Sequence, residues 1–340
     1  MKKAVRILSI VAIIAVVVAM SIGFVACDKG DNGYSRHDGQ VIRFAAPQGT
    51  PALAMLRLKT DNPMLDGTDM EYDVVAPSLI SAEMTGKKSD VLIMPINAGA
   101  NLIRQGADYK LVSVAVDGSL FMVGKKDGSD TLTFDDVKGQ KVACIGQGAV
   151  PGLVFGYVMA ANGIEIITSG EPNENQVFVQ YVADATVART AYLSGEVKYM
   201  VVGEPAATQF KNALSLNAEM DIQLAYKNSN SANGNSYPQA GLFVRTALAN
   251  DTKFMNALFD ALAASKTWVN ENKAEVSEFA SQNLYANATF PAASISRCAI
   301  NCNRLDETSK TEIITFFKNI MPKDGAGNAI NWDGAKDSIF

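Results

Sequence analysis

Residues that could perform chemistry are few in this chain. Its 340 residues include one histidine, His37, and four cysteines. Serine triads and Cys–His pairs need a histidine as general base, and His-ligated zinc needs it as a ligand, so a lone histidine in a polar segment excludes these mechanisms from the folded part. The adjacent acids Asp135 and Asp136 are interpreted as a solvated turn with a helix cap, because neighbouring side chains rarely point together. We expect no catalytic residue, no metal and no cofactor.

Three cysteines fall in the part of the chain that we expect to fold. Cys144 lies in an apolar run, and Cys298 and Cys302 are four residues apart near the start of a plausible helix. A disulfide at that spacing strains helical geometry, and three thiols without a histidine make a poor zinc site. We favour buried free thiols over a disulfide.

Glycine and polar residues follow several apolar runs, where a loop would lead into a helix. Ligands of open α/β sheets bind at the carboxyl ends of the strands. Gly49 and Gly148 would let a ligand approach the backbone, and the free N–H groups after them favour an anionic or hydrogen-bond-accepting group. These loops contain no Lys or Arg, which favours a neutral or singly charged organic ligand. The candidate ligand-binding residues are Gln48, Gly49, Thr50, Pro95, Asn97, Ala98, Gly148, Ala149, Val150, Glu204 and Tyr237.

Several of these residues have a second interpretation. The Glu204 carboxylate could accept hydrogen bonds from a ligand N–H, or form a salt bridge or cap within its lobe. Asn97 and Thr50 could contact a ligand, or cap a helix, which we favour for Asn97. Tyr237 and Phe121 could stack on an aromatic ligand, although core packing is the more frequent role of an aromatic side chain.

Strand and helix patterns alternate along the chain. Strands are expected at 41–46, 71–76, 91–94, 110–116, 141–145, 176–182 and 199–202, and helices at 52–59, from 77, 98–105, 152–162, 184–194, 251–283 and 308–320. This alternation predicts two doubly wound α/β lobes. A weak internal repeat supports two similar lobes, because 48–51 matches 147–151 and 94–95 matches 204–205.

The predicted domain boundaries follow from this repeat. Lobe 1 is discontinuous and comprises 41–122 plus 240–340, and lobe 2 comprises 123–239. The first crossing between the lobes is expected at 122–124. The second is expected at 237–241, directly after a polar surface loop at 228–236.

The N-terminus resembles a bacterial lipoprotein signal. Residues 1–26 combine a basic start with a long apolar stretch, and 23–27 reads GFVAC. This resemblance implies cleavage before Cys27, a lipid on its thiol and attachment to the outer face of the cell membrane. The alternative is an uncleaved transmembrane anchor. Residues 27–40 are polar and Gly-rich, as expected of a flexible tether after the lipidated cysteine.

The chain resembles the extracytoplasmic solute-binding lipoproteins of ABC importers, in the nitrate, sulfonate and thiamine-precursor group with the type II periplasmic-binding-protein fold. The resemblance rests on FAAPQGTPA at 44–52, DVLIMPINAGAN at 90–101, FDDVKGQKVACIGQG at 134–148 and GEPAAT at 203–208. It implies a monomer that captures a small organic solute between its lobes and delivers it to the permease subunits. Candidate solutes are thiamine-pyrimidine precursors, flavin-like heterocycles and sulfonates.

Two other functions are compatible with an α/β protein of this kind. One is a sensory binding protein that presents its ligand to a membrane receptor. The other is a pyrimidine-synthase-like enzyme, which draws on an active-site histidine and pyridoxal phosphate, and His37 as the only histidine argues against it. The formal net charge of −5 argues against nucleic acid as a partner.

Overall fold

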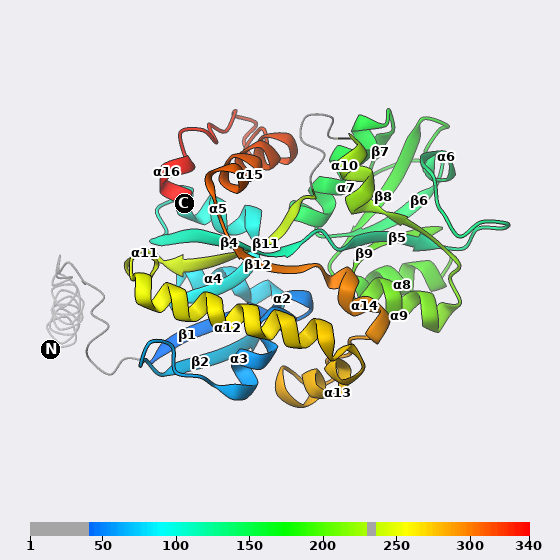
Figure 1. Cartoon of the computed structure of the whole chain (residues 1–340). Helices are drawn as coiled ribbons and strands as arrows, with labels where there is room; N and C mark the ends of the chain where they lie inside the picture. Colours follow the sequence, from blue (N-terminus) through cyan, green and yellow to red (C-terminus); the bar gives the residue numbers. More distant parts are fainter. Residues whose placement is uncertain (1–40, 230–235) are drawn as a thin grey trace, which may run out of the picture. The chain divides into compact units, whose positions relative to one another are not determined.

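The structure is a computed structural model that describes residues 41–229 and 236–340 (Figure 1). The predicted signal peptide, Cys27, His37 and the tether lie outside the described residues, as does most of the predicted loop at 228–236. Within the described ranges, none of the helices has the length and apolar character needed to cross a membrane.

The first of two six-stranded sheets contains strands from both ends of the described chain. β1 pairs in parallel with β2 and β3, whereas β11 lies antiparallel between β3 and β4, and β12 pairs antiparallel with β4. The order is β12-β4-β11-β3-β1-β2. The bounds are β1 Ile42–Pro47, β2 Met70–Val75, β3 Val91–Pro95, β4 Tyr109–Asp117, β11 Pro238–Arg245 and β12 Ile300–Arg304. We call the part of the chain built on this sheet lobe 1.

The second sheet is built from one continuous segment. β7, β8, β6 and β9 are parallel, and β5 is antiparallel to both β9 and β10. The order is β10-β5-β9-β6-β8-β7. The bounds are β5 Leu120–Gly124, β6 Lys141–Ile145, β7 Glu165–Ile167, β8 Gln176–Val182, β9 Tyr199–Gly203 and β10 Ala218–Asp221. We call this part lobe 2.

The two sheets repeat one strand order, which confirms two related α/β lobes. In lobe 1 the series is β2-β1-β3-β11-β4, and in lobe 2 it is β8-β6-β9-β5-β10. The fourth strand of each series is antiparallel to its neighbours. The sequence repeat follows this correspondence, because the similar loops at 48–51 and 147–151 follow the equivalent strands β1 and β6.

Helices connect the strands. Lobe 1 has α2 Thr50–Ala54, α3 Leu56–Asp61, η1 Pro77–Leu79, α4 Ile80–Thr85, α5 Ile96–Arg104, α11 Thr246–Ala249, α12 Thr252–Glu271, α13 Lys273–Asn283, α14 Ala292–Ile295, η2 Ser296–Cys298, α15 Glu307–Ile320 and α16 Lys336–Ile339. Lobe 2 has α6 Phe134–Val137, α7 Val150–Ala161, α8 Ala185–Leu193, α9 Ala206–Leu214 and α10 Ile222–Ser229. In Figure 1, α12 and α15 lie on opposite faces of the first sheet.

Aspartate side chains begin several helices. Asp184 accepts hydrogen bonds from two backbone N–H groups at the start of α8, and Asp251 does the same for α12. These contacts satisfy N–H groups that have no partner within the helix. The helix expected at 251–283 is divided, because Asn272 leaves helical geometry between α12 and α13.

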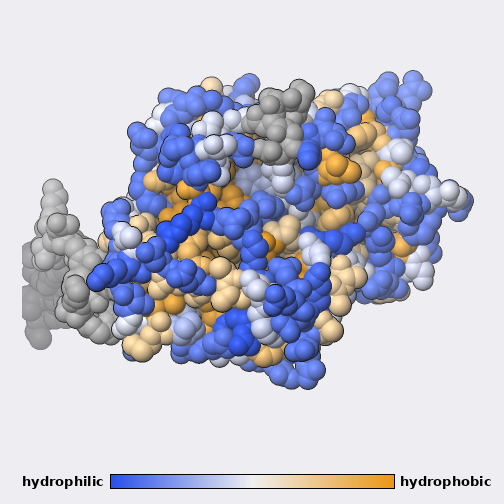
Figure 2. Space-filling model, viewed as in Figure 1, coloured by the Kyte–Doolittle hydropathy of each residue, from blue (hydrophilic) through white to orange (hydrophobic). Residues whose placement is uncertain are grey.

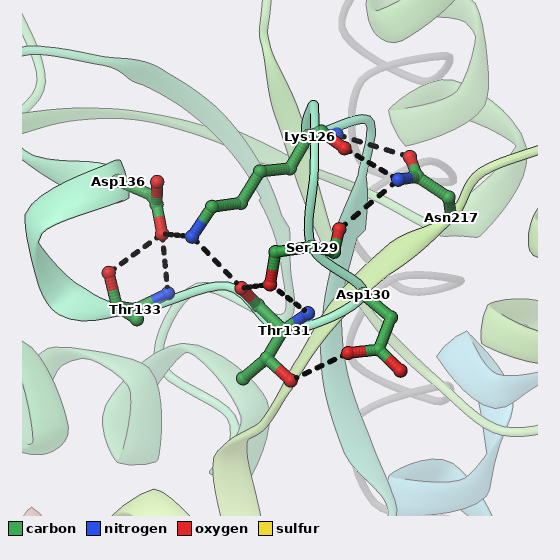
Figure 3. Close-up of polar contacts among 7 residues, drawn as sticks. All are labelled: Lys126, Ser129, Asp130, Thr131, Thr133, Asp136 and Asn217. Carbon is green, nitrogen blue, oxygen red and sulfur yellow. Dashed lines mark hydrogen bonds and ion pairs between the residues drawn. The ribbon is translucent and has the colours of Figure 1, made fainter.

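Asp136 confirms the predicted helix cap in lobe 2. Figure 3 shows its carboxylate beside Thr133 and Lys126. Asp136 Oδ2 accepts from the Thr133 backbone N and Oγ1, both at 2.7 Å, and from Lys126 Nζ at 2.7 Å. Burial opposes the charge, but these hydrogen bonds lower the pKa of Asp136 to about 2. The carboxylate is therefore a structural group at the start of α6.

The three described cysteines are free and buried, as expected. Cys298 ends the short 3-10 helix η2 and Cys302 lies in strand β12, so the two cysteines do not share a helix. Burial raises the pKa of all three thiols, to about 12 for both Cys298 and Cys302. A thiol with a raised pKa carries little reactive thiolate at neutral pH.

The exposed large apolar side chains occur in both lobes. Hydrophilic residues cover much of the face shown in Figure 2, with apolar groups visible between them. Within the described ranges, the exposed large apolar residues are Val41, Met64, Leu79, Val187, Leu193 and Leu224.

The chain changes sheets earlier than predicted. Residues 122–124 belong to β5 in lobe 2, because they pair with β9 and β10, so the first crossing consists of Gly118 and Ser119. The crossings are hydrogen-bonded side by side: Gly118 N donates to Tyr237 O at 2.8 Å, and Ser119 N donates to Gln239 Oε1 at 3.1 Å. A Cβ on Gly118 would lie 2.5 Å from the Tyr237 ring, so only glycine fits here without a shift.

Asp117, which ends β4 at this crossing, should make stability depend on pH. Burial raises its pKa to about 6, although the hydrogen bond from Asn301 and the charge of Lys266 oppose the shift. Because the folded pKa lies above the unfolded value, Asp117 contributes stability at low pH that is lost as the pH rises through about 6. We expect Asp117→Asn to raise the melting temperature relative to the parent protein more at pH 7.5 than at pH 4.5, measured by calorimetry. A difference independent of pH would contradict this.

Candidate functional site

The structure brings the loops at the strand ends together in two pairs, each with one loop from each lobe. Thr50, after β1, donates from Oγ1 to the backbone oxygen of Glu204, after β9, at 3.0 Å. Asn97, after β3, donates from Nδ2 to the backbone oxygen of Gly148, after β6, at 3.1 Å. Four predicted site residues therefore meet across the lobes.

The eleven candidate residues differ in their exposure to solvent. Gln48 and Gly148 are exposed, and Gly49, Pro95, Ala98 and Ala149 are partly exposed. The buried candidates are Thr50, Asn97, Val150, Glu204 and Tyr237. A Cβ on Gly148 would meet no atom within 4 Å, so there is open space beside this backbone.

The backbone N–H at Gly49 already has a partner. Gly49 has φ +97°, a conformation suited to glycine, and its N donates to Tyr285 Oη at 3.1 Å. Sequence reasoning missed Tyr285, since nothing in its local sequence indicates a contact with a loop far away in the chain. The contact leaves this N–H less available to a ligand.

Asn97 does not cap a helix, and that interpretation is wrong. α5 already begins at Ile96, so Asn97 lies inside its first turn and the N-cap position is Pro95. The Asn97 side chain instead reaches Gly148, and its Oδ1 is buried without a hydrogen-bond partner. A buried acceptor without a donor is unfavourable, so Asn97 Oδ1 is a polar atom at this contact whose hydrogen-bonding capacity is unused.

Glu204 forms a salt bridge, the second of its two interpretations, but the bridge joins the lobes. Its carboxylate accepts from Thr208 N at 3.1 Å and Thr208 Oγ1 at 2.9 Å. Arg297 Nε donates to the same carboxylate. The Glu204 side chain has no exposed surface, and its two oxygens are covered by these three donors.

Arg297 is the residue at this site that sequence reasoning missed. It lies in η2 of lobe 1, and its Nη1 and Nη2 donate to Glu219 Oε1 and Oε2 of lobe 2 at 2.8 and 2.9 Å. Its guanidinium lies 3.8 Å from the centroid of the Phe121 ring. Lys211 adds a 2.8 Å ion pair to Glu219. Arg297 stands directly before Cys298 in the sequence, and nothing in this local sequence indicates its distant partners Glu204 and Glu219.

The charges in this cluster stabilise one another. Burial would raise the pKa of Glu219, but hydrogen bonds from Arg297 and Lys211 lower it to about 2. Burial opposes the charge of Arg297 as well, yet Glu219 and Glu204 raise the pKa of the guanidinium. Glu219 and Arg297 are therefore both ionised at neutral pH.

Comparison with known proteins identifies the fold. No family model and no curated protein matches the chain. An ABC transporter structure from Parabacteroides distasonis matches with TM-score 0.67 and 21% identity over 85% of this chain and 96% of that one. The alkanesulfonate-binding protein from Xanthomonas axonopodis pv. citri, bound to MOPS, matches with TM-score 0.55 and 15% identity over 83% and 94%. A Candida albicans protein described as having the generic periplasmic binding protein fold gives TM-score 0.54 and 12% identity over 88% and 95%.

The chain has the periplasmic-binding-protein fold. This confirms the fold that the sequence resemblance implied. In this chain the strand-end loops of the two lobes meet through the two contacts described above.

Tyr237 lies at the second crossing of this fold and packs in the core. Its side chain is fully buried, stacked 6.1 Å from Phe316 and edge-on to Tyr226 at 5.4 Å. Burial raises the pKa of its hydroxyl. Core packing is thus its role in this structure. Phe121 is also buried, in the lobe 2 core beneath Arg297.

We expect Tyr237→Ala to destabilise the protein by about 3 kcal/mol or more, because a fully buried ring leaves a cavity beside Gly118. Urea unfolding followed by circular dichroism measures this change. Tyr192→Ala serves as the control, since Tyr192 is only partly buried on α8. Equal losses in the two variants would show that Tyr237 does not have this packing role.

Proposed function

We propose that this protein is the extracytoplasmic solute-binding subunit of an ABC importer and captures a small organic solute between its lobes. The observation that carries this proposal is the pairing of strand-end loops across the lobes, Thr50 with Glu204 and Asn97 with Gly148. Such loops are where open α/β sheets bind ligands. The similarity to an alkanesulfonate-binding protein supports the same function.

The proposed solute is neutral or singly charged. Glu204 and Glu219 are balanced by Arg297 and Lys211, so this cluster adds no net charge beside the loops. The exposed backbone at Gly148 and the unpartnered Oδ1 of Asn97 offer polar contacts without a formal charge. Thiamine-pyrimidine precursors, flavin-like heterocycles and sulfonates remain the candidate classes.

Closing the lobes around the solute would be a hinge motion. Gly118 and Ser119 form one crossing, and the chain returns at Tyr237. A ligand that contacts both lobes stabilises the closed form over the open form. A closed binding protein would then deliver its solute to the permease subunits, with no chemical step.

A thermal-shift screen tests solute binding. We expect one class among thiamine precursors, flavins, sulfonates, nitrate and amino acids to raise the melting temperature by a few degrees. A ligand at about 100 times its Kd adds roughly 2.7 kcal/mol of stability.

Gln48→Ala should weaken binding of the active compound, because Gln48 is exposed in the loop after β1. Gln105→Ala, at the exposed end of α5, is the matched control. Equal affinities of the two variants would remove Gln48 from the site.

The membrane anchor is part of the proposal. Residues 1–26 are proposed as a lipoprotein signal peptide and Cys27 as the lipidated residue. We expect Cys27→Ser to prevent incorporation of labelled palmitate in a bacterial host. Cys302→Ser should leave labelling unchanged, because Cys302 is buried in β12. Undiminished labelling of the Cys27→Ser variant would contradict the anchor.

A further inference from the structure

The Arg297 side chain crosses from one lobe to the other. Its backbone lies in η2, directly before β12, which belongs to the lobe 1 sheet. Its guanidinium donates to Glu204 and Glu219, which follow β9 and lie within β10 of lobe 2. The ring under the guanidinium, Phe121, also belongs to lobe 2. All of these contacts therefore join the lobes.

The geometry of this cluster is that of a strong ion pair. The two terminal nitrogens of Arg297 bind the two oxygens of Glu219 in parallel, which fixes both distance and orientation. The Arg297 side chain is 28% exposed, and that of Glu204 is 0% exposed. Ion pairs shielded from water in this way are screened less by salt than surface pairs.

Separating the lobes would break the ion pairs that Arg297 forms with Glu204 and Glu219. Within the described part of the chain, Arg297 is the one cation paired with the Glu204 carboxylate, and its other donors are the N–H and hydroxyl of Thr208. If Arg297 is replaced by an uncharged residue and the lobes stay together, the Glu204 charge remains buried and uncompensated, which is costly. Glu219 would keep Lys211 as a partner, whereas Glu204 would lose the cation with which it is paired.

We propose that Arg297 is an interlobe latch, which holds the two lobes together through protein groups alone. The latch consists of Arg297 in lobe 1 and Glu204, Glu219 and Phe121 in lobe 2. It biases the open–closed equilibrium toward the closed form without a bridging solute. This inference stands apart from the proposed transport function, because it concerns only the balance between two arrangements of the same chain.

Arg57 provides a matched control for Arg297. It pairs with Asp61 at 2.8 Å and lies over the rings of Trp268 and Phe279, at 5.0 and 5.3 Å. Its side chain is 29% exposed, nearly the same as that of Arg297. All of these contacts are within lobe 1, so Arg57→Met removes an equivalent cation without touching the contact between the lobes.

The experiment measures the distance between the lobes by double electron–electron resonance. Spin labels are placed on Ser81→Cys in α4 and Thr190→Cys in α8, which are exposed residues of lobes 1 and 2. The full chain carries Cys27→Ser, so that this thiol takes no label. The other native cysteines are buried, and the chain without the two introduced cysteines serves as the labelling blank.

We expect Arg297→Met to shift the distribution of distances between the spin labels toward a second, open population. Arg297→Lys should give a smaller shift, because lysine keeps the charge but cannot make the bidentate contact with Glu219. Arg57→Met should keep the parent distribution. An unchanged distribution in Arg297→Met would overturn the latch. The same shift in both methionine variants would overturn it as well, since loss of any stacked arginine would then suffice.

Discussion

The pair of hydrogen-bonded crossings is the constraint on which the rest of this structure depends. The Gly118 N–H binds the Tyr237 oxygen at 2.8 Å, and the Tyr237 ring occupies the space that a side chain on Gly118 would need. The two connections between the sheets are thereby held side by side. Since the strands on either side of them start or end at these crossings, their position determines which loops of the two lobes can meet.

The loops that meet follow non-equivalent strands of the two lobes. The contact from Thr50 to Glu204 joins the end of β1 to the end of β9, and the contact from Asn97 to Gly148 joins the end of β3 to the end of β6. β1 is equivalent to β6, and β3 is equivalent to β9. The internal repeat therefore relates one contact to the other, with the two lobes exchanged. The site is therefore a product of two copies of one supersecondary unit that face each other.

Much of the fold was predictable because its signals are local. The apolar runs 91–94 and 199–202 are buried strands, each parallel to one neighbour and antiparallel to the other, and Asp136 and Asp184 accept hydrogen bonds at the starts of helices as residue type suggests. The position of β5 was missed because an apolar run after a two-residue connection carries no signal of the sheet it joins. The sheet that β5 joins is determined by the order of the strands in the fold, not by the residue types of the run.

The site was predicted at the level of loops and missed at the level of side-chain partners. Arg297 meets Glu204 although 93 residues separate them, and Tyr285 meets Gly49 across 236 residues. Contacts at such separations depend on the packing of whole elements, which no local pattern encodes. Asn97 shows the same limit, because its partner Gly148 belongs to the other lobe.

The strand order also determines when each lobe can be completed as the chain is made. Lobe 2 is one continuous segment, so its sheet can form as soon as β10 has been synthesised. In lobe 1, β4 has only β11 and β12 as neighbours, and both follow the whole of lobe 2 in the sequence. β4 therefore has two unpaired edges throughout the synthesis of lobe 2. Such edges favour association with other chains, so the newly made N-terminal segment is the part of this protein most dependent on protection before folding is finished.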